Sequence, residues 1–167
     1  MNKYRTLIKW ALIHSGMFLA WMIIERLAGL HSNKLAMQQV VTTFILMPSF
    51  VIYILALRET RKNVYGGKIT YQQSFVSGLW LTTCIVILSP VNQMITTTII
   101  SPEYFSNLTA YVISKGIMTE EQAHKQFNNE NYIIQSVIGG LITGIIFSAI
   151  ISFFIKSNKQ SHEFKKS

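Results

Sequence analysis

The sequence predicts an all-α fold, that of a polytopic membrane protein with four transmembrane helices and a helical extracytoplasmic hairpin between helices 3 and 4. Two observations predict it: four long apolar segments, and charge that lies mostly between them. The segments are 7–24, 36–57, 75–100 and 133–155. A hydrocarbon core about 30 Å thick needs about 20 helical residues, and each segment is close to or above that length.

The composition supports this interpretation and excludes a soluble bundle. Half of the 167 residues are hydrophobic and 13% are charged, against about a quarter charged in soluble domains. A soluble helical bundle would need polar faces at 3.6-residue spacing inside the apolar runs, and the stretches 51–57 and 144–155 have none. We expect a single membrane domain over 1–167.

The basic residues predict the orientation of the chain. One set of loops and ends holds eleven of them: Lys3, Arg5, Lys9, Arg58, Arg61, Lys62, Lys68, Lys156, Lys159, Lys165 and Lys166. The other side holds four: Arg26, Lys34, Lys115 and Lys125. The positive-inside rule then places both termini and the middle loop in the cytoplasm. The net charge of +8 is therefore a topology signal, and no motif supports nucleic-acid binding.

The four helices are expected at about 6–30, 36–58, 71–100 and 132–156. The first begins like a signal peptide, but its apolar run is too long and no small-residue cleavage site follows. Pro48 near the middle of the second predicts a kink. The third should continue past Pro90, because stopping at Ser89 would leave it too short to span.

The outer loop, 101–131, is predicted to form the helical hairpin. Pro102 suits a first helical turn and Gly116 is a plausible end of that helix. Thr119 and Gln122 have the spacing of a capping box, which begins a second helix.

Small residues recur every four positions along the fourth helix. They are Ser136, Gly140, Gly144, Ser148 and Ser152. Such a stripe lets another helix approach closely. It is either a homodimer interface or a packing surface within the chain, for which Ser74, Gly78 and Thr82 on the third helix offer a partner stripe.

A candidate polar layer lies near the outer ends of the helices. Its members are Glu25, Arg26, Gln39, Asn92 and Gln93, with Gln38, Thr42 and Gln135 at a similar depth. Ionisable residues within a membrane indicate function by default, so the layer could bind an ion or solute. The alternative is interfacial anchoring and hydrogen bonding between helices.

Other chemistry-bearing residues stand alone. His14 is either a proton relay or a packed, hydrogen-bonded side chain. Glu121 and His124 form half of a Glu-x-x-His di-metal pattern, on a helix whose face is otherwise solvated. Cys84 has no partner for a disulfide. No catalytic or nucleotide-binding motif occurs, so we expect no enzymatic activity, no cofactor and no metal.

Nearly the whole chain, including the Gly-rich fourth helix, resembles a known family. The segments 57–62 (LRETRK) and 66–75 (GGKITYQQSF), with Gly78 and 101–105 (SPEYF), are similar to the uncharacterised domain family 4199. Ser74 stands where that family often has Ala, and Lys68 is inserted before Ile69. The resemblance implies a small four-helix protein in the inner membrane of a bacterium, mainly of the Bacteroidota. It implies no activity and no ligand-binding residues.

Two functions remain from these patterns. The first is a non-enzymatic membrane protein that acts through helix–helix or partner association, with the lipid bilayer and a homodimer or another membrane protein as partners. The second is a small transporter or channel component that uses the polar layer, motivated also by the prolines inside two helices.

Overall fold

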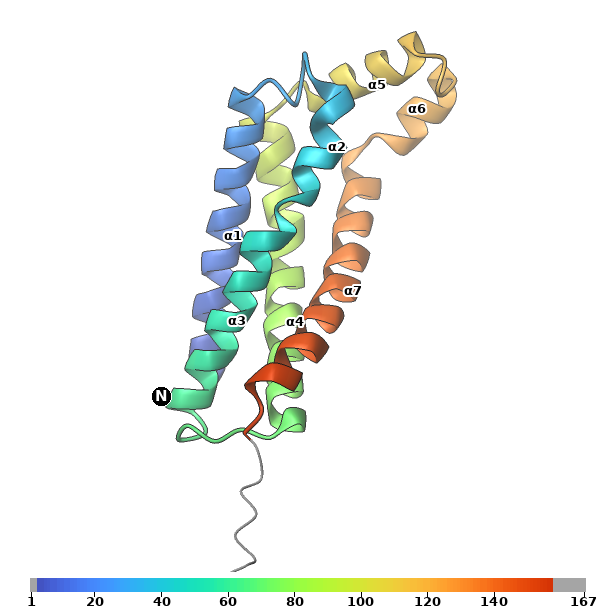
Figure 1. Cartoon of the computed structure of the whole chain (residues 1–167). Coiled ribbons are helices and arrows are strands. Elements are labelled where there is room, and N and C mark those ends of the chain that lie inside the picture. Colours follow the sequence, from blue (N-terminus) through green and yellow to red (C-terminus); the bar gives the residue numbers. More distant parts are fainter. Residues whose placement is uncertain (1–2, 158–167) are drawn as a thin grey trace, which may run out of the picture.

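The computed structural model describes residues 3–157, and the regular structure in that range is entirely helical (Figure 1). Its elements are α1 (Lys3–Leu27), α2 (Leu35–Thr43), α3 (Leu46–Asn63), α4 (Tyr71–Ile95), a π-helical turn η1 (Thr96–Ile100), α5 (Tyr104–Ser114), α6 (Glu120–Gln126) and α7 (Asn129–Ile155). Four spans are long and apolar enough to cross a membrane, at Lys3–Leu27, Leu35–Asn63, Tyr71–Ile100 and Asn129–Ile155. The predicted fold class is confirmed.

Helix α4 packs against α1, α3 and α7 and so links the bundle. The apolar core lies toward the end at which the described chain begins with Lys3 and ends with Ser157, which we call the termini end. Its buried side chains include Leu7, Ala11, Leu57, Leu81 and Ile151. Large apolar side chains elsewhere on the spans are exposed, Phe154 by 77% and Ile87 by 68%, as expected where hydrocarbon is the solvent.

The second span is one membrane span whose regular helix is interrupted at Phe44 and Ile45, two residues that keep right-handed helical dihedral angles. Helix α2 ends at Thr43 and α3 begins at Leu46, so Pro48 lies in the first turn of α3. Proline is tolerated there because its missing N–H would have had no helical partner. The break therefore falls a few residues before the proline.

Helix α4 continues through Pro90. A proline deprives the carbonyl four residues earlier of its donor. Here that carbonyl belongs to Val86, and the Ser89 hydroxyl donates to it at 2.8 Å. A neighbouring side chain thus satisfies the backbone group that the proline leaves free, as a membrane interior requires.

The termini end is closed by the 64–70 loop. Arg61 donates through Nε to the Gly67 carbonyl at 2.6 Å and through Nη1 to the Ile155 carbonyl at 3.0 Å. The backbone N–H of Ser157 donates to the Ile69 carbonyl at 2.8 Å. Hydrogen bonds therefore join the end of the second span, the 64–70 loop and the end of the fourth span.

Helices α5 and α6 form a hairpin at the opposite end, which we call the hairpin end (Figure 1). Gly116 has a φ of 65° and follows α5, and the Thr119–Gln122 capping box starts α6. Asn128 then caps α7 by accepting a hydrogen bond from the N–H of Asn131. Short capped breaks thus separate α5, α6 and α7.

Candidate functional site at the hairpin end

A carboxylate is buried in the last turn of α1. Glu25 is only 1% exposed. Its Oε1 accepts from Trp21 Nε1 at 2.6 Å, and its Oε2 accepts from the Thr42 hydroxyl at 2.9 Å. Nε2 of His31 lies 3.3 Å from the same Oε2. A buried charge needs such partners, and α1, the following turn and α2 supply them.

His31 joins this carboxylate to a different span. Its ring is buried, and Nδ1 lies 2.6 Å from the Ser101 hydroxyl at the end of η1. When Nε2 carries the proton toward Glu25, Nδ1 accepts from Ser101; when both nitrogens are protonated, both donate. The four groups Glu25, His31, Thr42 and Ser101 form one network, which we call the Glu25–His31 cluster.

A glycine turn brings His31 back over the end of α1. Gly29 has a φ of 78°, its N–H bonds to the Arg26 carbonyl, and the Leu30 N–H bonds to the Glu25 carbonyl. These two bonds define a Schellman motif, in which the left-handed residue is usually glycine. The chain therefore reverses within a few residues of Glu25.

The π-helical turn supplies the other side of the cluster. The N–H of Ser101 donates to the Thr96 carbonyl at 2.7 Å. The hydroxyl of Thr96 in turn donates to the Asn92 carbonyl. Single π turns widen a helix and often occur at functional sites. Here the turn ends where the Ser101 hydroxyl meets His31.

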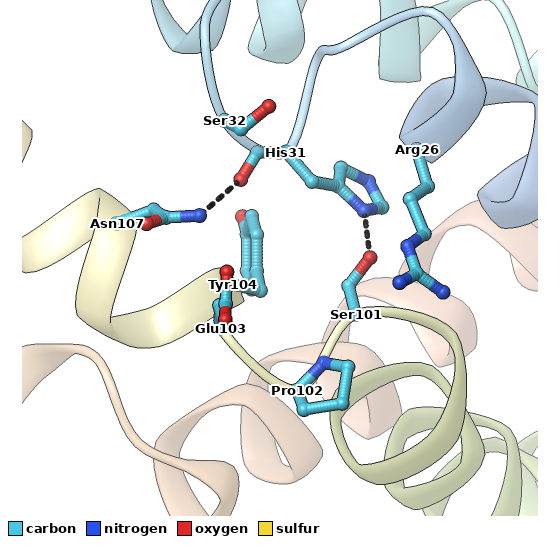
Figure 2. Close-up of a pocket in the computed structure, with 8 residues that line it drawn as sticks. All are labelled: Arg26, His31, Ser32, Ser101, Pro102, Glu103, Tyr104 and Asn107. Carbon is cyan, nitrogen blue, oxygen red and sulfur yellow. Dashed lines mark hydrogen bonds between the residues drawn. The ribbon is translucent and has the colours of Figure 1, made fainter.

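A pocket of about 310 Å³ lies beside this cluster (Figure 2). Arg26 and Tyr104 flank the His31 ring in Figure 2, and Asn107 Nδ2 donates to the His31 carbonyl at 3.1 Å. Residues from the α1–α2 turn and from the start of the hairpin line it: Arg26, His31, Ser32, Ser101, Pro102, Glu103, Tyr104 and Asn107.

Tyr104 fixes the hairpin to the bundle and remains an uncharged donor. Its ring centroid lies 5.1 Å from that of His31, and its hydroxyl accepts from Gln38 Nε2 at 2.9 Å. Burial raises the pKa of Tyr104 above its ordinary value, and the hydrogen bonds to Tyr132 and Gln38 oppose that shift.

The chain was compared with known proteins. Residues 9–157 match the family described as DUF4199, a protein of unknown function. The chain belongs to the DUF4199 family. The match confirms the resemblance that the sequence carries between residues 57 and 105. No curated protein and no solved structure is similar to this chain in the corresponding comparisons.

In this DUF4199 protein the predicted polar layer lies in two separate places. Glu25 belongs to the cluster described above and Arg26 is exposed on the pocket wall. Asn92 is 7% exposed and accepts from the Ser15 hydroxyl at 2.6 Å, next to the buried Gln93. Gln39 is exposed. The structure therefore bonds Thr42 to Glu25 and Asn92 to Ser15, while Thr42, Asn92 and Gln93 line one hollow together.

The stripe of small residues on α7 of the DUF4199 protein packs against α4. A Cβ added to Gly144 would overlap Thr82, and one added to Gly140 would lie 3.2 Å from Val86. Further along, Ser148 lies against Gly78, and the Ser152 hydroxyl donates to that of Ser74 at 2.9 Å. Ser136 lies 3.4 Å from the Ser89 hydroxyl. These close contacts lie within one chain.

The remaining singled-out residues make separate contacts. His14 Nε2 lies 3.2 Å from the Ser49 hydroxyl. His124 lies 4.0 Å from Glu120 on the exposed face of α6. Within residues 3–157 no three His, Cys, Asp or Glu side chains come together as a metal site would require.

Sequence reasoning missed two members of the cluster, His31 and Ser101, and also Trp21, which donates to Glu25. His31 lies in the turn between two spans, where a polar residue is unremarkable. The glycine two residues before it was the one available signal, because a left-handed turn at Gly29 is what returns His31 to Glu25.

Proposed function

We propose that this protein is a non-enzymatic inner-membrane protein that binds a small polar solute in the pocket at the hairpin end, as a component of a transport or sensing system. The observation that carries the proposal is the buried Glu25–His31 pair beside that pocket. Buried ionisable groups in membrane proteins cost stability and are typical of functional sites. The cluster keeps them paired, so the site is preorganised before any solute arrives.

The pocket walls indicate the class of solute. Arg26 and Glu103 both line the pocket, and neither side chain has an ion pair within the described residues 3–157. A guanidinium pairs with carboxylates, and a carboxylate pairs with ammonium groups. We infer that the solute is zwitterionic and that Asn107, Ser32 and Tyr104 add uncharged hydrogen bonds.

The binding test uses purified protein and a panel of amino acids and betaines. A zwitterion at about 100 times its dissociation constant stabilises the folded state by about 2.7 kcal/mol, which raises the unfolding temperature. Arg26→Gln and Glu103→Gln should each abolish that rise, whereas Lys34→Gln should not. A panel without effect, or variants that respond like the parent protein, would contradict the proposal.

We also infer that both termini and the 64–70 loop face the cytoplasm. The support is the distribution of eleven basic residues against four. Fusing a reporter that is active only in the cytoplasm to the C-terminus should give signal, and fusing it at 117–118 in the hairpin should give none. The reverse pattern would overturn the orientation.

A second candidate function is self-association, which one surface of α1 favours. Leu12, Gly16, Ala20 and Ile24 follow each other at four-residue spacing and are exposed, and a Cβ at Gly16 would meet nothing within 4 Å. Small residues at this spacing allow close helix contact. In a Cys84→Ser background, Gly16→Cys should crosslink two copies in native membranes. Gly144→Cys should not, because α4 covers that position.

A further inference from the structure

A second hollow lies between the α2–α3 span and α7, with α4 behind it. We call it the lateral groove. Its volume is about 420 Å³. Leu46 and Gly139, two of its lining residues, are exposed on the outside of the bundle. Most of its wall is apolar: Phe18, Ile45, Leu46, Ile85, Val86 and Phe147.

Two amide side chains that line this apolar groove lack full hydrogen bonding. Gln93 is only 9% exposed, and its carboxamide has no hydrogen bond to any described residue. Asn92 uses one end of its amide on Ser15. Whichever way that amide is oriented, its other end has no partner within residues 3–157. Both side chains line the groove.

An amide without a partner is costly in hydrocarbon, where no water can replace the missing bond. A ligand that offers a carbonyl or hydroxyl group to Asn92 and Gln93 would remove this cost. The groove has the usual form of a small-molecule site, with an apolar wall and a few polar groups that fix orientation.

The charged residues that line a groove help to determine which membrane lipids it can bind. No Lys, Arg, Asp or Glu lines the groove. Of its ionisable side chains, Tyr53 bonds to Thr82, whereas His14 bonds to Ser49 through Nε2 and its buried Nδ1 has no partner among the described residues. The lining therefore holds no Lys or Arg that would pair with a phosphate or a carboxylate. We propose that the lateral groove binds a neutral lipid with a free hydroxyl head, of the diacylglycerol class. The groove and the solute pocket share no lining residue, although Thr42 of the Glu25–His31 cluster also lines the groove, and this proposal does not rest on the proposed function.

The test compares two photoreactive lipids that share one acyl chain. The full chain is reconstituted in vesicles that contain either a photoreactive diacylglycerol or the matching phosphatidylcholine, and crosslinks are assigned by mass spectrometry. We expect diacylglycerol to label residues 85–93 and 136–147 about threefold more than phosphatidylcholine does, the factor for one average hydrogen bond in a membrane. The double variant Asn92→Leu, Gln93→Leu should remove this excess.

A second pair of variants separates binding from folding. Gly139→Leu and Gly16→Leu both place a side chain where a Cβ meets nothing within 4 Å, but only Gly139 lines the groove. Gly139→Leu should abolish the excess labelling and Gly16→Leu should preserve it. Equal labelling by both lipids in the parent protein would show ordinary boundary lipid and overturn the proposal. Retention of the excess in Gly139→Leu would overturn it as well.

Discussion

Nε2 of His31 lies 3.3 Å from Oε2 of Glu25, with both side chains at least 95% buried. Trp21 and Thr42 add two donors to the same carboxylate. Trp21, Thr42 and His31 all contact the one carboxylate of Glu25, so the effect of removing that carboxylate can be predicted.

We expect Glu25→Ala to lower the free energy of unfolding by about 3 kcal/mol, because it leaves buried donors without an acceptor. Equilibrium unfolding in mixed micelles measures this loss. Arg26→Ala is the matched control, since Arg26 is exposed; it should change stability by less than about 0.5 kcal/mol. Equal losses in the two variants would contradict the role of the cluster.

Because α7 approaches α4 closely, two glycine substitutions on α7 should have different effects on stability. Gly144→Ala should destabilise the protein by about 1–3 kcal/mol, because the new methyl group would overlap Thr82 and lie 2.7 Å from the Tyr53 hydroxyl. Gly139→Ala meets nothing and should be neutral or stabilise by up to about 1 kcal/mol through helix propensity. Thermal unfolding of the two variants in one detergent distinguishes the expected signs.

Because Gly29 forms the turn that follows α1, substituting it should destabilise that turn. Gly29→Ala forces an L side chain to a φ of 78° and should cost about 1–2 kcal/mol. Hydrogen exchange should rise in peptides covering 28–34, because the turn that holds His31 is strained. Gly16→Ala, in the middle of α1 and with open space around it, should leave exchange in that segment unchanged. Unaltered exchange in Gly29→Ala would argue against the turn as the positioning element.

The ion pair at the termini end should contribute little. Lys9 Nζ lies 2.6 Å from Glu59 Oε2, but the two side chains are 47% and 21% exposed. Lys9→Met should therefore cost less than about 1 kcal/mol, and the cost should shrink in high salt. Unfolding measured at two ionic strengths checks this, and a loss as large as that of Glu25→Ala would refute it.

The spans could be predicted because segment length and hydrophobicity are local properties. Residues 7–24 and 133–155 can each be recognised as a membrane helix from their own length and hydrophobicity. Pro48 predicted an irregularity in the second span, and it lies at Phe44 and Ile45, a few residues before the proline. A proline restricts the helix around it, but the position of the break depends on which turn of the new helix can take a residue without an N–H.

The candidate site could be predicted only in part. Counting residues by depth correctly placed Glu25 and Thr42 at one level, and they form a hydrogen bond. It also grouped Asn92 with Glu25, although Asn92 bonds to Ser15. Depth along a helix does not specify which face a residue occupies, and the faces are set by helix packing.

The order of the spans along the chain has a consequence for biogenesis. Ser74, Ser77 and Thr82 on α4 are buried, and Ser148 and Ser152 of α7 cover this region. Because α7 is synthesised after α4, the nascent chain exposes these hydroxyl groups to lipid until α7 leaves the translocon. A chain truncated before α7 would leave this surface of α4 uncovered. Membrane-bound quality-control proteases could then recognise the exposed hydroxyl groups as a sign of incomplete synthesis.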